Sequence, residues 1–460
     1  MSSIGPPTGM RDWLPQDALL RQRLMETISS VYRLYGYLPI DTPAMEDLAV
    51  LLDKGGGENE KLLFKILKRG EKLAQANDDE LADYGLRYDL TVPLARFVAT
   101  HQGKIPKVFR RYHIGPVWRA DRPQKGRYRE FYQCDIDVVG GASSAYEVEI
   151  ITATERVLKE LKLGKYRFRL SDKRLLPLVL GGYGATPDQV GSLTIALDKL
   201  DKDLTQARRE IEDVLPRGSE AWGKVDKFIL KFYAMRPHDT GRRERMNDFI
   251  KFLEDTKDQQ ILDAVADVLE GLKTIIDSVL AINPDSSLVF DPILVRGMDY
   301  YTGPVYEAVM DEGPKTSILG GGRYDGLIGR LARRDIPAVG CSIGFERILG
   351  ILQERTAGQA VAAASRVLLI CDEADAIRLQ QQAEQLRNEG FSVETYLDCD
   401  DVGKQFKYAE AAGITWAIKH LDEATSTITV RCIPTRQDHT LSVQDFKSRL
   451  HAESPGKERR

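Results

Sequence analysis

The first half of the chain alternates between helical and extended hydrophobic patterns. Apolar side chains recur at helical spacing over residues 17–35, and Gly36 follows where the C-terminal cap of a helix belongs. The next residues, 37–43, predict a strand that ends at a proline. A second amphipathic helix is predicted over 145–162 and a strand over 166–170. This mixture predicts an α/β (α+β) fold.

Residues 109–140 predict a hairpin of two strands joined by a turn at 123–128. After the turn, the side chains alternate with the two-residue period of a strand. The apolar set is Tyr132, Cys134, Ile136 and Val138, and the other set is Phe131, Gln133, Asp135 and Asp137. Because the apolar set belongs on a core, the second set is expected to face a cavity.

The composition and periodicity of the sequence change in the middle of the chain. Residues 177–287 are rich in charged side chains at helical spacing and predict a mostly helical insertion. Strand patterns return at 288–295 and 305–309. The glycine-rich run 320–326, taken alone, favours a tight turn. Residues 337–350 predict a strand that continues into a helix.

The last part of the chain alternates regularly between strands and helices. Strands are predicted over 366–371, 392–396 and 416–419, and helices over 375–388 and 403–412. Two βαβ steps with short connections predict a small, parallel-rich sheet that forms its own domain. The predicted boundaries are a core of 1–176 and 288–352, an insertion of 177–287, a linker of 353–364, a final domain of 365–450 and a tail of 451–460.

Composition and charge narrow the class of protein. At 460 residues the chain is too long for a single core, and 42% apolar with 29% charged residues is typical of a soluble globular protein. It shows no apolar run of membrane-spanning length and no signal-peptide pattern, so a cytoplasmic location is expected. The net charge is −4, yet residues 101–129 carry nine Lys or Arg against one acid, Asp121. Such a cluster indicates an anionic ligand.

The cysteines indicate neither a metal site nor a disulfide framework. There are five, with no C-x-x-C pair, and most lie in strand-like apolar segments: Cys134, Cys341, Cys371, Cys399 and Cys432. They are predicted to be reduced.

Common nucleotide signatures are absent or incomplete. No G-x-x-x-x-G-K-[ST] occurs, so a P-loop is excluded, and Asp325 stands where G-x-G-x-x-G needs its third glycine. The residues from His113 to Pro116 resemble a HIGH element only superficially, because the last histidine is missing. We treat them as a decoy.

Several candidate residues have ordinary structural alternatives. Arg347, in the first turn of the predicted helix near 350, either joins the helix N-terminus in an anion site or is a solvated arginine. The pair Tyr300 and Tyr301 is more often a packing pair. Asp89 and Thr91 could cap a helix that starts at residue 92.

Taken together, these segments resemble the class II aminoacyl-tRNA synthetases, and within them the histidyl-tRNA synthetase family. The region ending at Pro43, the Arg119 hairpin and the peptide GFERI at 344–348 resemble the three motifs of the class. The peptides LVRGMDYYTG (294–303) and GGGRYDG (320–326) resemble those of the histidine family, although Met298 replaces the usual leucine. GMRDWLP near the N-terminus and GKQFKYAEAAGI in the last domain also fit.

The resemblance implies a fold and an activity. The fold is a catalytic core built on an antiparallel sheet, with a helical insertion and a C-terminal βαβ anticodon-binding domain. The activity is histidine–tRNA ligation: L-histidine reacts with ATP, with Mg²⁺ bridging phosphates, and is then transferred to tRNA(His). A homodimer without membrane association is implied as well.

The resemblance also implies residue roles. Arg119 would bind the α-phosphate and Arg347 the γ-phosphate, while Arg127 reaches the outer phosphates. Phe131 would stack on adenine and Asp121 accept from its amino group. Arg296 would hold the reacting carboxylate and the α-phosphate together, so the catalytic set is Arg296, Arg119 and Arg347. We assign no side chain to a metal.

Histidine recognition is implied for a second set of residues. Asp89 and Thr91 would take the α-ammonium and Gln133 the backbone atoms of the amino acid. Asp137 with Tyr300 and Tyr301 would bind the imidazole, and Leu90 and Tyr324 complete the set.

Two noncatalytic alternatives were weighed. One is the synthetase-like regulatory subunit of ATP phosphoribosyltransferase, which usually lacks the last domain and has a degraded Arg296 peptide. The other is a nucleic-acid-binding or sensor module of synthetase type, in which the phosphate arginines are expected to be lost. This chain retains the domain, the peptide and Arg119, Arg296 and Arg347.

Overall fold

The computed structural model describes residues 4–52, 60–77, 80–124, 126–200, 203–234, 244–294, 300–312, 317–356, 366–371, 376–398, 401–422 and 425–453. It divides the chain into two units. One contains Met1–Asp12 and Arg21–Leu352, and the other contains Trp13–Leu20 and Gln353–Arg460. Each unit is described by itself.

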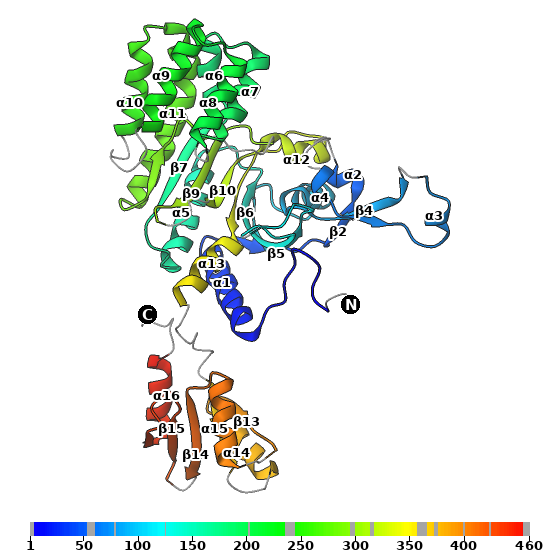
Figure 1. Cartoon of the computed structure of the whole chain (residues 1–460), viewed down its shortest axis with the longest axis vertical. Coiled ribbons are helices and arrows are strands. Elements are labelled where there is room, and N and C mark those ends of the chain that lie inside the picture. Colours follow the sequence, from blue (N-terminus) through cyan, green and yellow to red (C-terminus); the bar gives the residue numbers. More distant parts are fainter. Residues whose placement is uncertain are drawn as a thin grey trace. The chain divides into compact units, whose positions relative to one another are not determined.

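The first unit is built on an eight-stranded sheet with the order β1-β5-β6-β11-β10-β9-β7-β8 (Figure 1). The strands are β1 (Leu38–Pro39), β5 (Phe109–Trp118), β6 (Glu130–Val139), β7 (Tyr166–Asp172), β8 (Leu288–Phe290), β9 (Pro304–Met310), β10 (Ser317–Arg323) and β11 (Ala338–Gly344). In this order, each strand from β5 through β6, β11, β10 and β9 to β7 pairs with the next in antiparallel orientation. The outer pairs β1–β5 and β7–β8 are parallel. The predicted antiparallel core is confirmed.

One face of this sheet is apolar, as the alternation in the hairpin predicted. Cys134, Ile136 and Val138 of β6 are all 0% exposed. This unit also contains helix α5 (Ala145–Glu160), residues 21–34 of helix α1 (Pro15–Leu34) and residues 345–352 of helix α13 (Phe345–Thr356). In α1 the ring of Tyr32 lies 5.9 Å from that of Tyr112 on β5.

The opposite face is covered at one end by α4 (Thr91–His101) and α12 (Asp325–Ala332). Leu94 of α4 and Ile328 of α12 pack with Phe109 of β5 and Val139 of β6 in one buried cluster. The next inward-facing position on β6 is Asp137. This apolar end therefore shields the neighbouring polar positions from solvent.

A small sheet with the order β2-β4-β3 accompanies the large one. Its elements are β2 (Met45–Asp47), β3 (Lys65–Leu67) and β4 (Ala82–Leu86), with the short helices α2 (Leu48–Leu51) and α3 (Glu71–Ala74) and the 3₁₀ turn Glu60–Leu62. The chain leaves β4 and reaches α4 through Asp89, so this sheet leads directly to a predicted site residue.

The insertion is helical, as predicted (Figure 1). Its helices are α6 (Leu175–Gly182), α7 (Pro187–Asp198), α8 (Leu204–Val214), α9 (Glu220–Ala234), α10 (Glu244–Asp255) and α11 (Gln259–Ile282). A buried ion-pair network joins it to the sheet: Asp291 lies 2.7 Å from Nε of Arg169 on β7 and 3.1 Å from Nη2 of Arg245 on α10.

The second unit holds a five-stranded sheet with the order β13-β12-β14-β15-β16. Its elements are β12 (Arg366–Leu369), α14 (Ala376–Asn388), β13 (Ser392–Thr395), α15 (Val402–Ala411), β14 (Trp416–Asp422), β15 (Thr427–Cys432), β16 (Asp438–Ser442) and α16 (Val443–Glu453). The two predicted parallel steps are present, because β12 pairs in parallel with both β13 and β14. The antiparallel strands β15 and β16 and helix α16 were not predicted.

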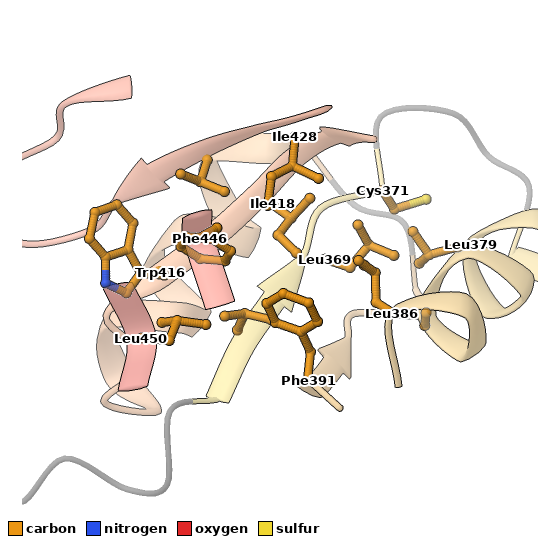
Figure 2. Close-up of a cluster of buried hydrophobic side chains, with 13 residues drawn as sticks. Leu369, Cys371, Leu379, Leu386, Phe391, Trp416, Ile418, Ile428, Phe446 and Leu450 are labelled. Carbon is orange, nitrogen blue, oxygen red and sulfur yellow. The ribbon is translucent and has the colours of Figure 1, made fainter. Parts of the chain in front are cut away.

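The hydrophobic core of this unit depends on the elements that were not predicted. Phe446 and Leu450 of α16 pack with Trp416, Ile418 and Ile428 in one buried cluster (Figure 2). Without α16 and β15, the first parallel steps would leave this apolar surface exposed to water.

Several expectations need correction. The glycine-rich run 320–326 is not a tight turn, because its glycines 320–322 lie in strand β10 and its last two residues begin helix α12. Helix α13 extends to Thr356 and so includes the first four residues of the predicted linker, and α16 includes the first three of the predicted tail. Cys134, Cys341 and Cys432 are free, as expected, but Cys371 is disulfide-bonded, contrary to the expectation. No helix in the described part of the chain is long and apolar enough to cross a membrane.

Candidate active site

The strand register places the predicted polar residues beside one another on one face of the large sheet. Asp137 of β6 lies opposite Arg111 of β5 and Gly340 of β11. Asp135 lies opposite His113 and Ser342 in the same two strands. A Cβ at Gly340 would stand 1.9 Å from Oδ1 of Asp137, so a side chain there would displace the carboxylate. Glycine is required at this strand position for that reason.

Asp137 is held between a cation and a phenol. It is 3% exposed, Nη2 of Arg111 lies 2.8 Å from its Oδ2, and the Tyr324 hydroxyl donates to its Oδ1. Burial raises the pKa of Asp137, while Arg111 and the Tyr324 hydrogen bond act in the opposite direction. A carboxylate fixed in this way is oriented before any ligand arrives.

Asp135 and Gln133 continue the polar face toward the hairpin loop. Burial raises the pKa of Asp135 to about 7 against the opposing charge of Arg111, whose Nη2 lies 3.9 Å away. Nε2 of Gln133 donates to Oγ of Ser342 at 3.3 Å.

Asp89 and Thr91 lie at the start of helix α4, where Asp89 can both cap the helix and bind a ligand. Oδ1 of Asp89 accepts from the backbone N–H of Val92 at 3.0 Å, so it caps the first turn of α4. Oδ2 is buried and has no hydrogen-bond partner in the described part of the chain. Leu90 is fully buried, and Thr91 is the first residue of the helix. One carboxylate oxygen stabilises the helix and the other is available to a ligand.

The predicted tyrosines gather at the same end of the site. The rings of Tyr300 and Tyr301 are 4.9 Å apart, and those of Tyr300 and Tyr324 are 5.8 Å apart. Tyr324 is 2% exposed and reaches Asp137 with its hydroxyl. Tyr324 therefore contacts the buried carboxylate directly, while Tyr300 packs against Tyr324 and Tyr301 packs against Tyr300.

Unpaired polar atoms mark this face as suited to a ligand. Buried side-chain atoms that have no hydrogen-bond partner within the described residues include Asp89 Oδ2, Arg111 Nε and Nη1, Gln133 Oε1 and Asp135 Oδ1. Buried polar groups in proteins are normally paired, because an unpaired one costs about 1–3 kcal/mol. A ligand with both donors and acceptors would satisfy several of these atoms at once.

The loop between β5 and β6 places cationic side chains at one end of the candidate site. The Arg119 guanidinium carbon lies 5.1 Å from the centroid of the Phe131 ring, and its Nε donates to the carbonyl of Tyr88 at 3.0 Å. Asp121 accepts from Nε of Arg127 at 3.0 Å. Thus Arg119 and Phe131 adjoin each other, whereas Asp121 and Arg127 pair together.

Arg347 lies in the first helical turn after β11, where sequence placed it. It is exposed, and its Nη1 donates to the carbonyl of Ser317 at the start of β10. Arg296 lies outside the described residues, which end at Leu294 and resume at Tyr300. No group of three His, Cys, Asp or Glu side chains that could hold a metal ion occurs among the described residues.

Sequence reasoning missed two residues of this face. Arg111 is fully buried beside both carboxylates and was counted only as part of the basic cluster. Cross-strand counting over the hairpin would have placed it opposite Asp137. His113, set aside as part of a decoy, lies opposite Asp135 with its Nε2 3.1 Å from Asp41, and burial with nearby Arg111 lowers its pKa to about 3.

Comparison with known proteins matches both parts of the chain to family models. The model for "Histidyl-tRNA synthetase" matches residues 9–348, and the model for "Anticodon binding domain" matches residues 367–453.

Curated relatives cover most of the chain. A histidine–tRNA ligase from Leifsonia xyli is 40% identical over 76% of this chain and 81% of its own length. A histidine–tRNA ligase from Treponema denticola is 34% identical over 97% of this chain and 95% of its own length.

Solved structures show the same fold. A histidyl-tRNA synthetase from Nostoc aligns with a TM-score of 0.80 at 25% identity, covering 98% of this chain and 99% of that one. A structure from Bacillus halodurans, described as an ATP phosphoribosyltransferase regulatory subunit/histidyl-tRNA synthetase, aligns with a TM-score of 0.71 at 19% identity, over 89% of this chain and 97% of that one. At that identity the second likeness concerns the fold alone.

Proposed function

The chain belongs to the histidyl-tRNA synthetase family, and we propose on that premise that it is a histidine–tRNA ligase. The observation that carries the proposal is the buried Asp137, fixed by Arg111 and Tyr324 on the face that leads to the Arg119 hairpin. An imidazole needs a buried, oriented carboxylate, and ATP needs cations nearby. This face provides both.

The first reaction step joins the two substrates. A carboxylate oxygen of histidine attacks the α-phosphorus of ATP, the bond to the bridging oxygen breaks, and pyrophosphate leaves. No protein nucleophile is required, so catalysis consists of positioning and of neutralising phosphoryl charge. We assign this to Arg119 at the α-phosphate, Arg347 at the γ-phosphate and Arg127 at the outer phosphates, with Arg296 bridging the carboxylate and the α-phosphate.

The adenine and the metal complete the ATP end. Phe131 would stack on the adenine, and Asp121 would accept from its amino group after leaving Arg127. Mg²⁺ would enter with ATP and be held mainly by phosphate oxygens, because the described residues offer no cluster of ligands for it. Bound there, it would neutralise charge on the outer phosphates.

The histidine end uses the unpaired atoms of the polar face. Asp89 Oδ2 and Thr91 would take the α-ammonium, with Leu90 packed between them, and Gln133 Oε1 would accept from the amino acid. Asp137 with Tyr300, Tyr301 and Tyr324 would bind the imidazole. A site that pairs buried groups with both ring nitrogens rejects analogues lacking them by roughly 10⁴-fold, so no editing site is required.

In the second step the terminal ribose hydroxyl of tRNA attacks the carbonyl carbon of histidyl-adenylate and AMP leaves.

The test of the proposed function is charging of a tRNA(His) transcript with labelled histidine. The regulatory-subunit alternative predicts no charging. It is disfavoured because the anticodon-binding domain at 367–453 and the Arg296 peptide at 294–303 are both present. A folded protein with ATP and histidine that charges no tRNA would contradict the proposal. We propose the cytoplasm as the place where this ligase acts.

Deleting residues 365–460 should separate the two reactions. The truncated protein is expected to form adenylate at a rate close to that of the full chain, because the assigned ATP and histidine residues all precede residue 365. Charging of tRNA(His) should fall by at least tenfold, because the final domain would no longer contribute anticodon contacts. Pyrophosphate exchange and charging are measured on the same preparation. An equal loss of both in a folded truncation would contradict this division of labour.

The homodimer remains a proposal supported by exposed apolar side chains near the first class motif. Leu34, Leu38 and Met45 are 65%, 64% and 47% exposed, and Leu38 lies on β1 at the edge of the sheet. An uncovered sheet edge with exposed apolar side chains tends to pair with another chain, so a second copy of this protein is expected to cover it.

Light scattering is expected to give twice the monomer mass for the unmodified chain. Leu38→Glu should shift the protein toward monomer, since a two-fold interface would receive the charge from both copies. Ile195→Glu, at an equally exposed leucine-sized side chain on α7, serves as the control and should leave the dimer intact. A fully active monomeric wild type would contradict the proposal.

A further inference from the structure

The N-terminal peptide lies against the hairpin loop. The backbone N–H of Arg129 donates to the carbonyl of Gly9 at 2.8 Å, and Nη1 of Arg129 donates to the carbonyl of Thr8 at 3.5 Å. Gly9 has φ of 86°, and a Cβ there would stand 2.8 Å from Cγ of Pro123 and 2.9 Å from Cγ of Arg129. Both its conformation and its close contact with the loop favour glycine.

Arg11 extends this contact to a second segment. Its guanidinium carbon lies 3.4 Å from the centroid of the Tyr128 ring, so the cation covers the ring face. Its Nη2 also forms an ion pair with Oε2 of Glu346. Glu346 is itself anchored, because its Oε1 accepts from the backbone N–H of Tyr132 at 3.3 Å and its side chain is only 6% exposed.

The two segments joined by Arg11 carry three of the four proposed phosphate-binding arginines, all except Arg296. Tyr128 stands between Arg127 and Arg129 in the loop, and Glu346 immediately precedes Arg347. Apart from Arg296, these arginines therefore come from two places in the chain, and the Arg11 guanidinium contacts Tyr128 beside Arg127 and Glu346 beside Arg347.

We propose that Arg11 is a positioning residue for ATP, which holds the hairpin loop and the start of α13 in one arrangement before the nucleotide binds. This inference rests on the proposed function. Arg11 itself touches no reacting atom in this account; it acts through Tyr128 and Glu346.

The physical reason is the cost of ordering a loop. The Arg127 side chain is 56% exposed, and its Nε donates to Oδ2 of Asp121 at 3.0 Å, so ATP binding would have to immobilise a side chain that is largely in solvent. Immobilising such side chains on binding costs conformational entropy, and a contact that fixes the loop beforehand removes part of this cost. Arginine suits the position because its plane can stack on Tyr128 while its edge meets Glu346; lysine retains only the charge.

The test uses Arg11→Ala, Arg11→Lys and Gly9→Ala in the full chain. Arg209→Ala, at an exposed arginine of the insertion helix α8, is the matched control. Two readouts are combined. Hydrogen exchange of the backbone amides of residues 124–129 is followed in the protein without ligands, and KM values for ATP and for histidine are measured by pyrophosphate exchange.

Arg11→Ala is expected to speed exchange of the loop amides and to raise KM for ATP by about tenfold, with KM for histidine changed less than twofold. Arg11→Lys should lie between wild type and alanine, and Gly9→Ala should loosen the same amides. Arg209→Ala should change neither readout.

If hydrogen exchange of the loop amides and KM for ATP are both unchanged in Arg11→Ala, the inference is overturned. A lower melting temperature in that variant would not rescue it, because Arg11 would then only form an ordinary stabilising ion pair. Equal increases in both KM values would overturn it as well. Failure of the proposed function is a separate result: wild type would show no histidine-dependent pyrophosphate exchange, whereas the loop amides would still respond to Arg11→Ala.

Discussion

Replacement of Arg296 by lysine is expected to slow adenylate formation by about a hundredfold while the fold, the oligomeric state and ATP affinity stay close to those of the wild type. The assigned role requires a planar fork that addresses the histidine carboxylate and the α-phosphate at once, and an ammonium group cannot reproduce it. Loss of one such contact in the transition state costs about 3 kcal/mol, which corresponds to the stated factor.

The alternative role of Arg296 is an ion pair with Asp299 or another acid, and it predicts a mild effect because lysine keeps the charge. Single-turnover formation of histidyl-adenylate, with enzyme in excess, separates the two. Arg334→Lys, at an exposed arginine after α12, is the control for a conservative change without consequence. A near-wild-type rate in Arg296→Lys would remove this residue from the catalytic set.

Replacement of Asp137 by alanine or asparagine is the second change with a large expected effect. The carboxylate is 3% exposed and proposed as the acceptor for an imidazole N–H. Its removal should weaken histidine binding by roughly 10- to 100-fold, since a buried hydrogen bond to a charged group contributes about 1.5–3 kcal/mol. ATP binding should change less than threefold.

The alanine variant has an additional consequence, because Arg111 would lose the carboxylate 2.8 Å from its Nη2. An uncompensated buried charge is destabilising, so thermal unfolding is measured beside calorimetric titration with histidine. Asp137→Asn keeps the shape and is the more informative variant, and Asp335→Asn, at an exposed carboxylate before β11, is its control. Unchanged histidine affinity in Asp137→Asn would make Asp137 a structural strand residue only.

The polar face of the hairpin could be predicted because strand periodicity is a local property. Once Cys134, Ile136 and Val138 are assigned to the core, Asp135 and Asp137 must point to the other side of the sheet. The structure agrees, with all three apolar side chains fully buried and both carboxylates buried on the opposite face. Family resemblance added the roles, which periodicity alone does not provide.

The glycine run could not be assigned correctly from its own residues. Glycines at turns supply unusual backbone angles, but those of β10 serve close packing in a sheet. A Cβ at Gly321 would stand 2.2 Å from the carbonyl of Gly340, and one at Gly322 would stand 2.7 Å from that of Pro304. Both neighbours are distant in sequence, so this requirement is visible only in the assembled sheet.

Arg111 and the end of the final domain were missed for a related reason. The partners of Arg111 are defined by the register of β5 against β6 and by the start of α4, where its Nη2 donates to the carbonyl of Leu90 at 3.4 Å. Strands β15 and β16 carry short mixed patterns, and they form strands because β15 pairs with β14 and β16 pairs with β15. Their structure depends on tertiary context more than on local propensity.

Histidine-dependent exchange of labelled pyrophosphate into ATP is the decisive measurement for the proposed ligase activity, because it requires ATP, histidine and a reversible adenylate but no tRNA. Exchange is expected with L-histidine, none is expected without an amino acid, and little is expected with amino acids that lack two ring nitrogens. Absence of exchange in a folded protein that binds ATP, or exchange independent of which amino acid is supplied, would contradict it.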